Sequence, residues 1–142
     1  MTIANANANV IAVDRAIAEF RRGRPVLVEA ENGDTALALA AEQSSPDSLR
    51  DLCAWSDGGD GAGGARAVLV LTESRAQALH IKPTGQGVVL LPINQNTDAG
   101  LVQTLADGST DLAQPMRGPF QRERRTPYAT ETAAVQLAKA AR

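Results

Sequence analysis

The N-terminal part of the chain has the hydrophobic spacing of a helix. Apolar side chains recur every three or four residues in this region: Val10, Val13, Ile17 and Phe20. Gly23 follows, where a left-handed residue commonly ends a helix. Residues 1–9 are rich in Ala and Asn and lack this spacing. The pattern predicts an amphipathic helix from Val10, preceded by a flexible leader over residues 1–9.

An acidic turn separates two short apolar runs between Pro25 and Glu42. The pair Asn32-Gly33 favours a type I′ turn, which would fold the two runs together as a hairpin. Three carboxylates lie at or near its tip: Glu29, Glu31 and Asp34. Carboxylates in a tight turn suit a divalent cation, but a solvated hairpin tip has the same composition. The turn by itself favours the solvated tip.

The remaining pattern alternates between helix and strand. The expected elements are a helix from Pro46, a strand over 67–71, a helix over 73–80 capped by Thr72, a strand over 87–93 and a last helix capped by Thr130. Residues 101–112 fit a helix or a strand, and 115–127 read as irregular. Together these elements predict an α/β, or α+β layered, fold with a mixed β-sheet covered by the first, third and last helices. The last helix shows no stop signal before Arg142, which suggests a longer parent chain.

Three features that could take part in catalysis or binding have simpler structural interpretations. Cys53 shares an apolar helix face with Leu49, Leu52 and Trp55, which predicts a core thiol rather than a nucleophile. His80 ends a predicted helix, where a cation is favoured, so capping is preferred to catalysis. Residues 57–64 are rich in glycine but lack a phosphate-loop motif, which predicts a mobile loop.

Length and charge limit the classes of function. The 142 residues match one domain, placed at 10–142. Lys plus Arg is 14 and Asp plus Glu is 16, a net charge of −2, so no basic field attracts nucleic acid or an anionic membrane. One cysteine and one histidine exclude an internal disulfide and a Cys/His zinc site. Without a secretory signal or a membrane span, we expect a cytoplasmic protein that binds neither nucleic acid nor membrane.

Three stretches, taken in order, resemble a known enzyme family. Residues 13–42 combine a helix, a strand, the acidic turn and LALAAE; residues 71–79 read LTESRAQAL; residues 132–139 read TAAVQLAK. Together they resemble 3,4-dihydroxy-2-butanone-4-phosphate synthase, an enzyme of riboflavin biosynthesis that also occurs fused in front of GTP cyclohydrolase II. The family's corresponding motifs are LTEERADRL and EAAVDLAR. The resemblance implies a shortened synthase-like fold and a homodimer.

The chain departs from this family at the residues that perform its chemistry. The family's acidic loop, DRENEGD, is reduced here to ENGD over Glu31–Asp34, and the metal-binding histidine of its GHTE motif is missing from ATET over Ala129–Thr132. The resemblance therefore implies a degenerate, inactive synthase-like domain. Its expected role is structural, dimerising or regulatory for a covalently attached C-terminal GTP cyclohydrolase II domain, and no cofactor is expected in this chain.

The alternative is an active Mg²⁺-dependent lyase of the synthase type, or a sugar-phosphate-binding enzyme, acting on ribulose 5-phosphate. Such an enzyme must stabilise an enediolate with a metal and move protons with acid/base groups. Glu31 and Asp34 are the candidate catalytic residues, with Glu31 also the candidate Mg²⁺ ligand. The candidate substrate-binding residues are Arg122, Arg124, Arg125 and Glu131. This alternative requires Glu31 and Glu131 to face one pocket with an arginine within reach of a phosphate.

Overall fold

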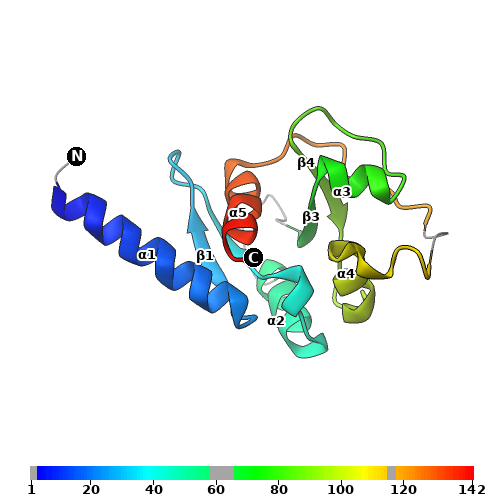
Figure 1. Cartoon of the computed structure of the whole chain (residues 1–142), viewed down its shortest axis with the longest axis horizontal. Coiled ribbons are helices and arrows are strands. Elements are labelled where there is room, and N and C mark those ends of the chain that lie inside the picture. The colour runs from blue at the N-terminus through cyan, green and yellow to red at the C-terminus, as the bar shows by residue number, and fades with distance from the viewer. Residues whose placement is uncertain (1–2, 58–65, 115–117) are drawn as a thin grey trace.

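The chain forms helices around two separate antiparallel pairs of strands, referred to as the two hairpins (Figure 1). The computed structural model describes residues 3–57, 66–114 and 118–142. The elements, in chain order, are α1 (Ile3–Arg21), β1 (Val26–Glu29), β2 (Thr35–Ala38), η1 (Ala41–Gln43), α2 (Pro46–Asp57), β3 (Val68–Thr72), α3 (Glu73–Ala78), β4 (Val88–Pro92), α4 (Ala99–Ala106), η2 (Gly108–Thr110) and α5 (Ala129–Ala140). The predicted α/β class is confirmed.

The strands pair differently from the single mixed sheet that the sequence predicts. In the described residues β1 pairs only with β2 and β3 only with β4, and both pairs are antiparallel. The reason lies in the connection between β3 and β4. Because α3 ends after six residues, the chain returns to the end of β3 that it left, and Val88 pairs with Thr72. A parallel β4 would have required a crossover to the opposite end of β3.

Both faces of the β3–β4 pair are buried, which explains the continuous apolar runs in these strands. One face carries Leu69, Leu71, Val89 and Leu91, which pack in one cluster with side chains of α2, α3 and α4. The other face carries Val68, Val70, Val88 and Leu90, which pack against Val135 of α5. Helix α5 also contacts β1 and β2, so it is the element that joins the two hairpins.

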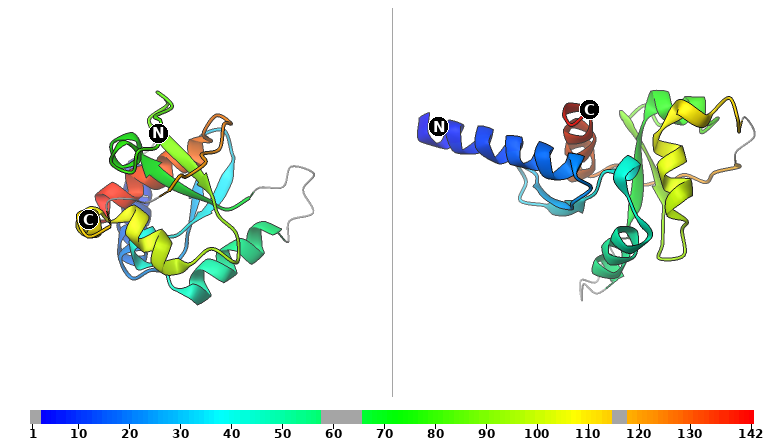
Figure 2. Two further views of the ribbon diagram at one scale, coloured as in Figure 1. Left: turned by 90° about the vertical axis from the view of Figure 1, so that its right-hand side faces the viewer. Right: turned by 60° about the horizontal axis from the view of Figure 1, so that its bottom comes forward.

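Helix α1 begins at Ile3, earlier than the predicted start at Val10, and much of it projects away from the rest of the chain (Figures 1 and 2). Its C-terminal end is anchored, because Phe20 is buried and Arg21 Nε donates to the carbonyl of Ala141 at 2.6 Å. The predicted left-handed cap is confirmed at Gly23, with φ +71°. In the described residues, no helix has the length and apolar character needed to cross a membrane.

Several local predictions need correction. The acidic turn is a three-residue loop closed by Ala30 and Asp34, and only Gly33 has a positive φ (+86°), so the type I′ turn is wrong. Helix α5 starts at Ala129 with Tyr128 as its N-cap, so Thr130 lies inside the first turn. The ambiguous stretch contains a helix, α4, because Asp98 caps it by accepting from the amide of Leu101.

Candidate functional site

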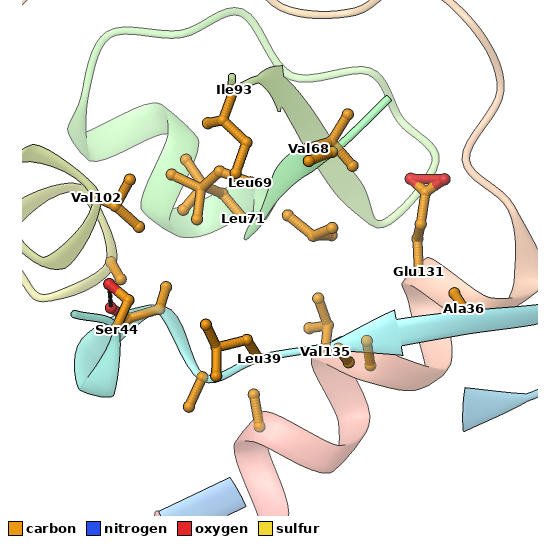
Figure 3. Close-up of a pocket in the computed structure, with 18 of the residues that line it drawn as sticks. Ala36, Leu39, Ser44, Val68, Leu69, Leu71, Ile93, Val102, Glu131 and Val135 are labelled. Carbon is orange, nitrogen blue, oxygen red and sulfur yellow. Dashed lines mark hydrogen bonds between the residues drawn. The ribbon is translucent and has the colours of Figure 1, made fainter. Parts of the chain in front are cut away.

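A wide cleft lies between the two hairpins, with α5 beside both (Figure 3). Its volume is about 1780 Å³, which exceeds the roughly 300–1,000 Å³ of a typical small-molecule pocket. Residues 34–39, around β2, and residues 67–72, around β3, line it continuously. Further lining side chains come from α5, α2 and α4, including Val135, Leu49 and Val102. The cleft is therefore bordered on two sides by strands, and its lining is more apolar than polar but includes charged side chains of both signs.

Glu131 is a buried carboxylate at one end of this cleft (Figure 3). It lies in the first turn of α5 and is 7% exposed. Its Oε1 accepts from Arg125 Nη1 at 2.8 Å and from the amide of Tyr128 at 3.4 Å. Its Oε2 is buried without a hydrogen-bond partner among the described residues. A buried acceptor is normally paired, so Oε2 has the capacity to accept a donor from a bound molecule.

Among the three candidate arginines, only Arg125 lines the cleft. Its guanidinium is paired with Glu131, lies 4.2 Å from the centroid of the Tyr128 ring and donates to the carbonyl of Thr126 at 3.3 Å. Arg122 is half-buried and Arg124 exposed, and both lie outside the cleft lining. The arginine nearest Glu131 therefore neutralises that carboxylate.

The acidic turn and Glu131 do not form one site. Glu31 is exposed and does not line the cleft, although Asp34 does. The Asp34 carboxylate accepts from Asn32 Nδ2 at 2.7 Å, and the Asp34 amide donates to Asn32 Oδ1 at 3.1 Å. Glu29 is exposed on β1. In the described parts of the chain, no three Asp, Glu, His or Cys side chains are grouped so that they could hold a metal ion.

The LTESRAQAL motif supplies internal contacts. Thr72 Oγ1 caps α3 by accepting from the amide of Arg75 at 3.2 Å. Glu73 accepts from Thr84 Oγ1 at 3.1 Å and from the amide of Gly87 at 3.3 Å. Partial burial acts to raise the pKa of Glu73, but the hydrogen bonds from Thr84 and the loop amides outweigh it and lower the pKa.

Arg75 is a structural residue that the sequence pattern did not reveal. Its guanidinium donates to the carbonyls of Leu105 at 2.7 Å and Thr104 at 3.1 Å, and it forms an ion pair with Asp111. These contacts cap the C-terminal end of α4. Asp111 lies 36 residues away in the chain, so no local spacing signals this partner.

The lone cysteine and histidine occupy structural positions. Cys53 is 1% exposed, which confirms the predicted core thiol, whereas Trp55 on the same helix is 65% exposed. His80 lies two residues beyond α3 with φ +59°, and the following amide, of Ile81, donates to the carbonyl of Ala76 at 2.8 Å. This is a left-handed cap formed by the backbone of His80. The glycines of the predicted loop over 57–64 lie outside the described residues.

The chain is similar to a known protein over most of its length. It is 34% identical over 131 residues to a GTP cyclohydrolase-2 from Azospirillum brasilense. The match covers 92% of this chain but 32% of that protein, so the chain spans about a third of the length of its curated relative. No family model and no solved structure matches the chain. The chain is therefore related in sequence to one part of a GTP cyclohydrolase-2.

Proposed function

We propose that this chain is a degenerate synthase-like domain of riboflavin biosynthesis that supports a C-terminal GTP cyclohydrolase II domain by structural, dimerising or regulatory contacts. The similarity to a GTP cyclohydrolase-2 over 92% of the chain supports the link to that enzyme. The resemblance of the three motifs to the synthase family supports the origin of the scaffold.

The observation that carries the proposal is that the residues of the LTESRAQAL motif make structural contacts within the chain. Thr72, Glu73 and Arg75 bind other parts of the same chain and do not form a catalytic cluster. Glu31 and Glu131 occupy separate places, and Glu131 is paired with Arg125. The synthase reaction needs a metal and proton-transfer groups at one substrate. This chain is therefore proposed to have kept the scaffold of that fold and lost its chemistry.

An exposed surface on α1 suits the proposed contacts with another subunit or domain. Val10, Ile11 and Val13 are 60%, 57% and 53% exposed on the projecting part of this helix. Large aliphatic side chains gathered on one element commonly mark a contact with another protein surface. We propose that this part of α1 contacts a second subunit or the downstream domain.

A formate-release assay with ribulose 5-phosphate and Mg²⁺ tests the loss of synthase activity. We expect no formate above the rate of the protein-free reaction. Turnover at about 1 s⁻¹ or faster would contradict the proposal and support the active lyase. In that case Glu31→Gln and Glu131→Gln would identify which carboxylate is used.

A chimera tests the supporting role. The segment of the Azospirillum brasilense protein that matches this chain is replaced by this chain. GTP hydrolysis, thermal unfolding and molecular mass in solution are then compared with those of the native protein and of a protein lacking the segment. We expect the chimera to equal the native protein and the truncated protein to lose activity, thermal stability or its oligomeric state. A truncated protein equal to the native one in all three measurements would contradict the proposal.

A further inference from the structure

We propose that the cleft between β2 and β3 is a slot for one added β-strand, and that its occupant is an extended, uncharged, aliphatic peptide segment of another polypeptide. The argument uses the pairing of the strands, the lining of the cleft and the unpartnered oxygen of Glu131. It does not depend on the proposed role beside a cyclohydrolase domain.

The backbone of β3 directs polar groups into the cleft. In an antiparallel ladder, residues that bond across the pair alternate with residues whose N–H and C=O point away from it. The amide of Ile93 donates to the carbonyl of Ala67 at 3.1 Å, so in the observed register Leu69 and Leu71 are bonded to β4. Val68 and Val70 therefore point their N–H and C=O groups away from β4 and toward the cleft.

An independent contact on the far side of β4 confirms this alternation. The carbonyl of Leu90, opposite Val70, accepts from the amide of Glu123 at 2.8 Å, so it points away from β3. In the same alternation Val68 and Pro92 form a pair that is not hydrogen-bonded, which suits Pro92 because it has no N–H. The edge of β4 is thus occupied by Glu123, and the edge of β3 faces the cleft.

β2 presents a second such edge from the other side. The amide of Ala30 donates to the carbonyl of Asp34 at 2.8 Å, so in the observed register Ala36 and Ala38 are bonded to β1. Thr35 and Leu37 then direct their N–H and C=O groups away from β1, and both residues line the cleft. Among the described residues, no hydrogen bond joins these groups, or those of Val68 and Val70, to another part of the chain.

Two unpaired edges that face one cleft match the two edges of a single added strand. A strand that bonded to both edges would join β1, β2, β3 and β4 into one sheet, which requires a spacing of about 4.7–4.9 Å to each neighbour. Addition of a peptide strand to a sheet edge is an established mode of recognition, with main-chain bonds providing affinity. β2 has four residues and β3 five, which sets the length of the paired segment.

The side chains around the slot define the chemistry of the occupant. The cleft lining includes the aliphatic side chains of Val135, Leu49 and Val102, from α5, α2 and α4, together with charged side chains of both signs. An added strand therefore meets aliphatic side chains and no lining of a single charge. Strands buried in this way are continuously apolar. Glu131 Oε2 supplies one acceptor, while its charge is already paired with Arg125. A neutral donor such as a hydroxyl at one end of the peptide satisfies it better than a second cation.

A second copy of this chain fits the slot less well. A strand that fills the slot must bond along both of its edges, whereas each described strand already bonds a neighbouring strand along one edge. A copy therefore has no described strand with two free edges to insert. A peptide from a different polypeptide meets the geometry without this obstacle.

The direct test uses a synthetic peptide, acetyl-Lys-Thr-Val-Val-Val-Thr-Lys-amide, labelled for fluorescence anisotropy and titrated with the full chain. The valines match the aliphatic slot, the threonines offer a hydroxyl to Glu131, and the lysines keep the peptide soluble. We expect saturable binding with a Kd below about 1 mM. The control peptide carries N-methyl groups on the first and third valines, which keeps the side chains but removes two donors, and should bind at least about tenfold more weakly.

The location of binding is tested on the protein. Val70→Pro removes an amide that faces the cleft without removing a bond to β4, and proline is tolerated at strand edges. We expect this variant to lose peptide binding while its circular dichroism is unchanged. If it fails to fold, the same question is answered by amide exchange in the unaltered chain, where the peptide should slow exchange at Val68, Val70 and Leu37.

Three results would overturn the proposal. One is the absence of saturable binding below about 1 mM, and another is equal binding of the two peptides. The third is a dimer, detected by light scattering without peptide, in which the amides of Val68 and Val70 are already protected. That result would make a second copy the occupant.

Discussion

Replacing Arg75 with methionine should remove the main tertiary cap of α4. The Arg75 side chain is 14% exposed, and methionine keeps much of its apolar stem while removing every donor. The change deletes the bonds to the carbonyls of Leu105 and Thr104 and leaves Asp111, 32% exposed, without this partner. Hydrogen bonding to Asp111 is also the leading reason that the pKa of Arg75 is raised.

The expected loss follows from these contacts. A hydrogen bond from a charged group contributes about 1.5–3 kcal/mol, and breaking a buried ion pair costs about 3–5 kcal/mol. Since Asp111 is partly solvated, the ion-pair figure must be reduced for screening. We therefore expect Arg75→Met to lower the free energy of unfolding by about 3 kcal/mol, a large part of the roughly 5–15 kcal/mol of a typical domain.

Urea unfolding followed by circular dichroism measures this loss. The matched control is Arg50→Met, because the Arg50–Asp47 pair on α2 is 61% and 85% exposed and should contribute less than about 1 kcal/mol. Arg75→Lys keeps the charge but not the planar fork of donors, and should recover only part of the loss. An Arg75→Met effect no larger than that of Arg50→Met would refute the capping argument.

Three further predictions concern the strands, the loop beside α3 and the end of α1. Amide exchange should be slower at Leu71, which is bonded to β4, than at Val70, by about tenfold or more in the free chain; equal protection would contradict the assigned alternation. Because the pKa of Glu73 is lowered, its carboxylate stabilises the fold above the unfolded pKa of about 4.3 and loses this effect as pH falls through the folded pKa. Urea unfolding at neutral and acidic pH should therefore show a smaller loss of stability for Glu73→Gln than for the parent chain, and an unchanged loss would argue against the Thr84 contact. Gly23→Ala should cost about 1 kcal/mol more than Gly33→Ala in thermal unfolding. Both glycines have positive φ, but only at Gly23 would a Cβ lie 2.9 Å from a backbone oxygen, that of Gln43. Equal costs would show that this close approach is not limiting.

The sequence pattern was sufficient to locate the ends of elements where the signal is local. Thr72 before α3, Ser45 before α2 and Gly23 after α1 act through neighbours three or four residues away, and all three lie where the pattern predicts an element boundary. The acidic turn shows the limit of such signals. Asn32-Gly33 is compatible with more than one tight turn, and the closing bond between Ala30 and Asp34 selects the three-residue loop.

The candidate site was less accessible from the sequence. Glu131 was identified by its place in a motif, but its burial depends on α5 packing beside both hairpins. Its pairing with Arg125 rather than with a phosphate, and its separation from Glu31, depend on the path of the irregular segment before α5. No residue spacing within the sequence encodes these distances.

The sequence by itself determined most of the helices and strands, the buried thiol of Cys53 and the absence of a strong charge field, because each depends on local spacing or on composition. It did not determine the start of α1 or the helical state of α4. The tertiary structure decided which strands pair. The apolar runs of β3 and β4 require two covered faces, but they do not state which edge is bonded. Only the register, fixed by where α3 returns the chain, shows that Val70 turns its backbone toward the cleft and that β2 faces it from the other side.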